Sequence, residues 1–400
     1  MFYKPALQWA SIALLIRLIL GLLIHNYSLQ VGFKGFVPMS NYGDDILYWD
    51  LAEQMGLGYD TGYTINLYPM FLAVLFQLTG PSILAAKLVN MMFNVVAIFV
   101  TVLIVKEVGE SSGLDRRQTR WAGNVTGALL ALYPSQIFYA VQMIKDPFLI
   151  FAGTINLYLA ILILRGKGRK TWNLSGWFLT MLGVVAFRPY TLIALVGSWL
   201  IYLLFVWKTK ISRKIAVLVV VLLVVGVLPY FAGLGFFASN YIAPWLDVEK
   251  VSEFRKNGYS TGGSAADITI DYSNPISFFQ TYGFSVLTAM FGPFPWQVKS
   301  PIQVIALPEA LFALAMSLVL LVPLGKARRK VADREGQSVP YILLIFSVVL
   351  VGLIGLFSDS IGGNTRLRIL SWNMFFAYSA IVFAGRYVSS KKSASSLKRL

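Results

Sequence analysis

The sequence predicts an all-α membrane protein, a polytopic bundle of about ten transmembrane helices, and three observations lead to this prediction. Hydrophobic residues make up 57% of the chain and charged residues 13%, and the mean hydropathy is +0.68. These values lie far outside the composition of soluble domains. The apolar runs are as long as helices, which favours a helical bundle over a barrel of alternating ten-residue strands. The basic residues gather in short clusters between these runs, as they do in cytoplasmic loops.

Ten apolar runs are long enough to cross a membrane as helices. They cover residues 9–26, 83–105, 120–136, 146–165, 172–187, 189–207, 214–233, 304–325, 340–357 and 369–386. The first run is interpreted as an uncleaved span because no small-residue cleavage site follows it. Two further stretches, Leu67 to Leu78 and Ile276 to Trp296, are short or interrupted by Gly and Pro. We expect these two to be interfacial or re-entrant.

The distribution of charge predicts the orientation of the chain. Most of the 34 Lys and Arg residues fall in segments that lie on one side if both termini are cytoplasmic. The chain then divides into an amino-terminal transmembrane module, residues 1–233, an outer segment, 234–303, and carboxy-terminal helices with a basic tail, 304–400. The module contains a long first outer loop, residues 27–82, and loops of this length usually carry function.

Composition also excludes several kinds of site. The net charge of +16 does not indicate nucleic-acid binding, because the cations are spread over loops between apolar runs. The chain has no cysteine, which rules out disulfides, thiolate metal sites and thiol nucleophiles. His25 is the only histidine, so a histidine-cluster metal site is excluded, as is Ser-His catalysis unless His25 itself serves.

Seven charged residues lie on the predicted outer face although the orientation rule expects few cations there. They come from four separate parts of the chain: Asp44, Asp45, Lys145, Asp146, Arg188, Arg366 and Arg368. A carboxylate pair facing several cations suits an anionic ligand, and the planar fork of Arg matches a phosphate. The alternative is that each charge anchors a helix end among the lipid head groups.

The first outer loop contains a predicted helix that begins at the carboxylate pair. Leu47, Leu51 and Met55 recur at helical spacing, which predicts an amphipathic helix on the membrane surface. The positive end of the helix dipole would keep Asp44 and Asp45 ionised and able to accept a proton. The alternative for Asp44 is a plain helix cap.

Arg17 lies near the middle of the first predicted span. A charge at that depth costs at least about 2.5 kcal/mol in lipid, so we expect this side chain to face the bundle interior. An ion pair or a backbone contact there is favoured over ligand binding.

A series of short motifs over residues 9 to 165 resembles one enzyme family. The motifs are Asp44-Asp45-x-x-Tyr48-x-x-x-Ala52, Tyr68-Pro69-Met70-Phe71-Leu72-Ala73, Leu78-Thr79-Gly80-Pro81-Ser82, Ala85-x-x-Leu88-Val89-Asn90 and Tyr133-Pro134-x-x-x-Phe138-Tyr139. In this order they resemble the amino-terminal half of GT-C glycosyltransferases, in the branch of protein O-mannosyltransferases and lipid A aminoarabinose transferases. Weaker echoes occur around Arg366. Two departures are that the second acid of the family's Asp-Glu pair is Asp45 here, and that no separate soluble domain is evident.

The resemblance implies a hexosyl- or pentosyltransferase that moves a sugar, with inversion, from a polyprenyl-phosphate donor to a hydroxyl of a glycan, lipid or protein. Asp44 would be the general base, Asp45 would orient a cation or the acceptor, and Tyr48 would match the family's tyrosine. The residues expected to bind the substrate or its leaving phosphate are Lys145, Asp146, Arg188, Arg366 and Arg368. No cofactor is expected, although a metal bridging Asp44 and Asp45 is conceivable. The implied location is a bacterial plasma membrane, with the site on its outer face.

Three rival functions make different demands on the same residues. Another cell-envelope polysaccharide polymerase or ligase would use the outer arginines but not Asp44. A lipid-linked-sugar transporter would line a path to the midplane with charges, whereas only Arg17 lies deep. A scaffold or assembly subunit would leave the outer charges apart in space.

Overall fold

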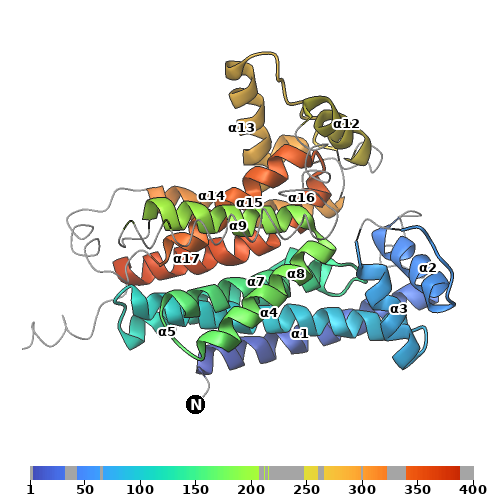
Figure 1. Ribbon diagram of the computed structural model, residues 1–400, viewed down its shortest axis with the longest axis horizontal. Coiled ribbons are helices and arrows are strands. Elements are labelled where there is room, and N and C mark those ends of the chain that lie inside the picture. Colours follow the sequence, from blue (N-terminus) through green and yellow to red (C-terminus); the bar gives the residue numbers. More distant parts are fainter. Residues whose placement is uncertain are drawn as a thin grey trace, which may run out of the picture. The chain divides into compact units, whose positions relative to one another are not determined.

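The computed structural model describes residues 3–31, 43–63, 66–206, 211, 215, 247–259, 265–298, 301–321 and 339–387. Within these residues the regular structure is helical (Figure 1). One isolated antiparallel bridge joins Ala265 and Ser360. The prediction of an all-α chain is therefore confirmed for the part of the chain that the structure describes.

The chain forms two compact units. Unit 1 comprises residues 1–195, 323–343 and 369–400, and unit 2 comprises 196–322 and 344–368. The helices up to residue 206 are α1 (Lys4–Gln30), α2 (Asp44–Gly56), α3 (Tyr68–Thr79), α4 (Ile83–Ser111), α5 (Arg116–Leu132), α6 (Pro134–Ala140), α7 (Asp146–Leu164), α8 (Lys170–Phe187), α9 (Pro189–Ile201) and the π-helix η1 (Tyr202–Val206). Those that follow are α12 (Val248–Tyr259), α13 (Pro275–Phe291), the 3₁₀-helix η4 (Pro295–Gln297), α14 (Pro301–Leu321), α15 (Tyr341–Phe357), α16 (Ile361–Leu367) and α17 (Ile369–Tyr387).

Three of these helices, α1, α4 and α7, are long and apolar enough to cross a membrane. A fourth span results if α16 and α17, which are bent by 54° at their junction, are counted as one. Several long apolar helices are compatible with an integral membrane protein. The total of about ten spans remains a prediction, and the predicted span 214–233 lies outside the described residues except for Ile215. The two stretches expected to be interfacial or re-entrant form α3 and α13.

The core of unit 1 is a set of helices packed along their length. α4 contacts α1, α5 and α7, and the late helix α17 packs against α5 and α4 (Figure 1). The helices approach closely where glycine faces a large side chain: a Cβ at Gly127 of α5 would come within 2.5 Å of the Trp9 ring of α1. Small residues at such crossings are typical of helix packing in membranes.

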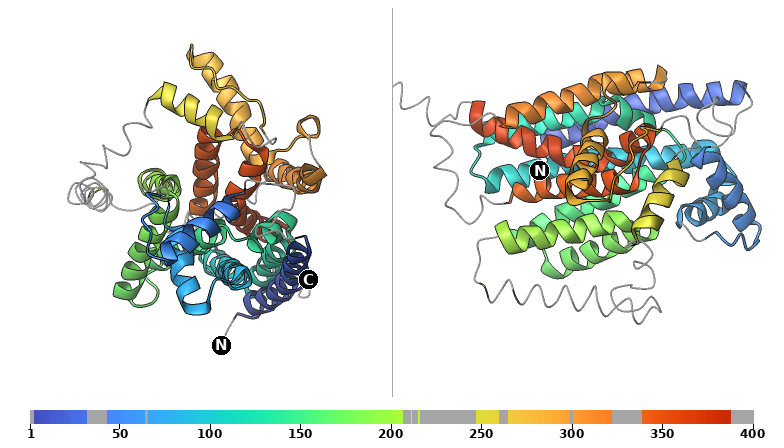
Figure 2. Two further views of the ribbon diagram at one scale, coloured as in Figure 1. Left: turned by 90° about the vertical axis from the view of Figure 1, so that its right-hand side faces the viewer. Right: turned by 90° about the horizontal axis from the view of Figure 1, so that it is seen from above.

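The two ends of α4 are held in different ways. Near its carboxyl end, the buried Glu107 accepts hydrogen bonds from Arg165 and, at 2.7 Å, from Lys167. Near its amino end, α2 and α3 pack against each other, and both lie at the same end of α1 and α4 (Figures 1 and 2). The predicted site residues of unit 1 gather at that amino end.

Candidate active site

α2 begins at the carboxylate pair, as the sequence predicts. Gly43 occupies the cap position, so Asp44 is the first helical residue and the cap alternative for Asp44 is wrong. The Asp44 side chain is exposed, whereas Asp45 is buried and its Oδ1 accepts a hydrogen bond from the Ile46 amide at 3.0 Å. Both carboxylates lie in the first turn of α2.

The buried face of α2 consists of Asp45, Tyr48, Trp49 and Ala52. The Trp49 ring lies 4.8 Å from that of Phe76 in α3, and the Tyr48 ring lies 5.2 Å from that of Tyr68. Of the predicted apolar stripe, Leu47 is 47% exposed, while Leu51 and Met55 are half-buried. The helix prediction is therefore confirmed, and its main packing face is the one that contains Tyr48.

A hydrogen-bond network links α2 to the segment before α3. Asn66 donates to the hydroxyl of Tyr63 at 2.7 Å and to that of Tyr48 at 3.4 Å, and its Oδ1 accepts from the Tyr68 amide at 3.0 Å. Burial, and secondly the charge of Asp44, raise the pKa of the Tyr63 hydroxyl. Tyr63 therefore stays neutral beside Asp44 at physiological pH.

Asn90 of α4 links this network to the turn before α7. Its Nδ2 donates to the Tyr68 hydroxyl at 2.9 Å and to the carbonyls of Gln142 and Ile144 at 2.7 and 2.8 Å. All of these groups are buried, and a hydrogen bond in a buried site is stronger than one exposed to water. The segment that contains α2 and α3 is thus linked to α4 and to the turn before α7.

An ion pair lies at the same end of unit 1. Asp146 is the first residue of α7, and Arg188 lies where α8 ends and α9 begins. Their side chains are buried and meet at 2.8 Å, and the Arg188 guanidinium lies 5.6 Å from the centre of the Tyr190 ring. A backbone hydrogen bond also links the residue before α3 to the end of α8: the Leu67 amide donates to the Ala186 carbonyl at 3.0 Å.

The electrostatic couplings show that the loop and the ion pair share one neighbourhood. The charges of Asp45 and Asp146 both act on the Tyr68 hydroxyl, and Asp45 also interacts with the buried Lys87 of α4. Lys145 is the cap residue of α7, next to Asp146. The structure therefore brings together six of the eight predicted residues: Asp44, Asp45, Tyr48, Lys145, Asp146 and Arg188.

The other two predicted residues, Arg366 and Arg368, belong to unit 2. Arg366 lies in the last turn of α16. Arg368 is completely buried, and its Nη1 donates to the carbonyls of Ala289 and Met290, both at 3.4 Å, and of Gly292. These carbonyls are at the end of α13, so Arg368 stabilises a helix terminus. The geometry thus gives Arg368 a structural role at a helix end, inside the protein rather than among lipid head groups.

Sequence reasoning missed three residues of this neighbourhood: Tyr68, Lys87 and Asn90. Their signal was present in the sequence, because Lys87 and Asn90 are polar residues inside a predicted span and such residues seldom face lipid. Arg17 behaves as expected. It is buried, its Nε donates to Asn94 at 2.7 Å, and two carbonyls at the end of α5, those of Leu130 and Ala131, each accept at 3.2 Å.

This arrangement can take up a proton at an exposed carboxylate and can offer positive charge to an anion beside it. No group of three or more His, Asp or Glu side chains that could hold a metal occurs in the described ranges. No protein-family model, curated protein or solved structure matches the chain.

Proposed function

We propose that the chain is a membrane glycosyltransferase that moves a sugar from a polyprenyl-phosphate-linked donor to an acceptor hydroxyl. One observation carries the proposal. The exposed Asp44, beside the buried Asp45, starts a loop helix that a polar network fixes to the helix ends bearing Lys145, Asp146 and Arg188. The GT-C resemblance of residues 9 to 165 uses the same carboxylates.

In the proposed reaction, Asp44 accepts the proton of the acceptor hydroxyl while that oxygen attacks the anomeric carbon of the sugar. The new glycosidic bond forms as the bond to the phosphate oxygen breaks on the opposite face, which inverts the configuration. The polyprenyl phosphate leaves with the bonding electron pair. Asp44 suits the role because its carboxylate is exposed and lies in the first turn of α2.

The leaving phosphate gains negative charge as its bond to the sugar breaks, and fixed cations stabilise that change. In unit 1 we assign this role to Arg188 and Lys145. Asp146 holds one arm of the Arg188 guanidinium, which orients the fork. Asp45 and Tyr48 support Asp44 from the buried face of α2.

We place this site on the outer face of a bacterial plasma membrane, with a glycan, lipid or protein as acceptor. The charge distribution of the loops supports that side. A polysaccharide polymerase or ligase and a lipid-linked-sugar transporter are the competing functions, and neither requires a base at Asp44.

The test is transfer of radiolabelled sugar from polyprenyl-phosphate donors by the full chain in reconstituted membranes. Asp44→Asn retains size but removes basicity, so transfer should fall by about a hundredfold to ten-thousandfold. Asp45→Asn should reduce transfer less. Asp50→Asn, an exposed carboxylate of the same helix, is the matched control and should change little.

Thermal unfolding, followed in parallel, should be nearly the same for Asp44→Asn and the wild type, because Asp44 is exposed. Near-normal turnover by Asp44→Asn would show that this mechanism is wrong. Wild-type transport of the donor without sugar transfer would favour the transporter.

A further inference from the structure

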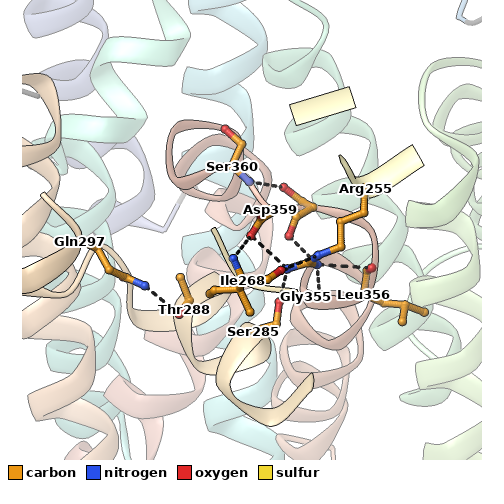
Figure 3. Close-up of polar contacts among 10 residues, drawn as sticks. Arg255, Ile268, Ser285, Thr288, Gln297, Gly355, Leu356, Asp359 and Ser360 are labelled. Carbon is orange, nitrogen blue, oxygen red and sulfur yellow. Dashed lines mark hydrogen bonds and ion pairs between the residues drawn. The ribbon is translucent and has the colours of Figure 1, made fainter. Parts of the chain in front are cut away.

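Arg255 of α12 is a buried cation that the proposed chemistry does not use. Its side chain is 5% exposed although α12 is otherwise largely polar. The guanidinium donates hydrogen bonds to three other segments of unit 2 (Figure 3). They are the Ile268 carbonyl (3.1 Å), Ser285 Oγ of α13 (2.9 Å), and the end of α15 through the carbonyls of Gly355 (2.7 Å), Leu356 (3.5 Å) and Ser358 (2.9 Å).

The end of α15 explains why a guanidinium is needed. The last carbonyls of a helix have no partner within it, and inside a membrane protein no bulk water replaces them. A cation also opposes the negative end of the helix dipole. Only Arg carries enough N–H donors in one plane to bond α15, α13 and Ile268 at once. Ser285 of α13 also donates directly to the Gly355 carbonyl of α15, at 2.7 Å.

The same guanidinium holds a short non-helical segment, residues 265–270, which we call the strap. The strap pairs with the junction between α15 and α16: Ala265 bridges Ser360, and the Ala266 amide donates to the Asp359 carbonyl at 2.7 Å. Asp359 Oδ1 accepts from the Ile268 amide at 3.0 Å and from Arg255 at 3.2 Å. The strap side chains Ile268 and Ile270 are buried.

α16 starts from this junction. Ser360 Oγ accepts from the Gly363 amide at 3.0 Å, which caps α16, and Arg366 lies in the last turn of this two-turn helix. The direction of α16, and with it the place of Arg366, therefore depends on residues 358–360, which Arg255 and the strap hold.

We propose that Arg255 fastens the strap to the end of α15 and so fixes the α15–α16 junction, and with it the place of Arg366 within unit 2.

The first experiment is hydrogen exchange with mass spectrometry on the full chain. Arg255→Lys keeps the charge but not the fork, so the amides of Ala266 and Ile268 should exchange about tenfold to a hundredfold faster. Lys250→Gln, on an exposed position of the same helix, is the matched control and should leave strap exchange unchanged. Unchanged strap exchange in Arg255→Lys would overturn the proposal.

If Arg255→Lys does not fold, Asp359→Asn serves instead. It keeps an oxygen for the Ile268 amide and removes only the charge that faces Arg255. Faster strap exchange supports the fastening, and wild-type exchange overturns it.

The second experiment follows the amides at the start of α16 in the same variants. The Gly363 amide donates to Ser360 Oγ at 3.0 Å and the Asn364 amide to the Ser360 carbonyl at 2.7 Å, so both should exchange faster when the junction is no longer held. Unchanged α16 exchange in a variant with faster strap exchange would overturn the part of the proposal that concerns the junction.

Discussion

The two units use buried arginines in different ways. In unit 1, Arg188 meets a carboxylate, that of Asp146, at the end where Asp44 is exposed. In unit 2, Arg255 and Arg368 donate mainly to backbone carbonyls at the ends of α15 and α13. Arg17 of unit 1 follows the pattern of unit 2, because it serves the end of α5.

This difference shows that a cation among apolar helices is not by itself a ligand site. Membrane helices that end inside the protein leave carbonyls to be satisfied, and a guanidinium does this well. The surroundings of a cation are therefore more informative than its position in the sequence. A nearby carboxylate pair and a polar network indicate chemistry, while a row of carbonyls indicates stability.

Breaking the Arg188–Asp146 pair should give the largest effect. Arg188→Gln leaves a buried carboxylate without its partner, so the free energy of unfolding should fall by about 3–5 kcal/mol. The double variant Asp146→Asn, Arg188→Gln should recover most of that stability but not sugar transfer, which should stay about 10²-fold down. Unfolding and transfer assays separate the two quantities, and recovery of transfer in the double variant would assign Arg188 to structure alone.

Arg17→Lys should give the next largest effect, on stability only. Lysine cannot reach Asn94 and the carbonyls of Leu130 and Ala131 together, so the free energy of unfolding should fall by about 2–3 kcal/mol. Transfer per folded molecule should not change. Arg368→Lys is the corresponding variant in unit 2. If Arg17→Lys lost more transfer activity than the loss of folded protein explains, Arg17 would contribute to the reaction. The distinction between arginines that cap helix ends and those that take part in sugar transfer would then be wrong.

Tyr68→Phe should give the smallest effect and sharpen the picture of the network. Its hydroxyl accepts only one of the Asn90 hydrogen bonds, and Asn90 keeps the carbonyls of Gln142 and Ile144. The free energy of unfolding should fall by about 1 kcal/mol. Tyr59→Phe, at an exposed tyrosine, is the control and should match the wild type in the same measurement. A loss above about 3 kcal/mol would mean that the Tyr68 hydroxyl organises the whole loop.

Continuous apolar runs made the long helices predictable. The runs 83–105 and 146–165 correspond to α4 and α7, which begin at the predicted residues. The run 120–136 is instead divided into α5 and α6, because Pro134 cannot continue the helix hydrogen bonds and restricts Tyr133 before it. Hydropathy alone does not report such a break.

The residue pattern of the loop also predicted where the candidate site begins, but not which side chains would contact each other there. A helix starting at Asp44 follows from residue spacing within the loop. The pairing of Asp146 with Arg188, and of Asn90 with Tyr68, joins residues far apart in the sequence and depends on how the helices pack. Arg255 could not be predicted, because a single cation in a polar segment is usually solvated. Only the structure shows that its side chain is buried.

The contacts of Asn90 also bear on the order in which the chain is made. The loop with Asp44 emerges from the ribosome before α4, and α4 before the turn whose carbonyls, at Gln142 and Ile144, hold Asn90. A nascent chain that ends before this turn contains the carboxylates and Tyr68. It lacks the two carbonyls that hold the Asn90 side chain in place. We therefore expect the segment with Asp44 to acquire its final shape only after the turn before α7 has been synthesised, so that one of the first segments to be translated is among the later ones to mature.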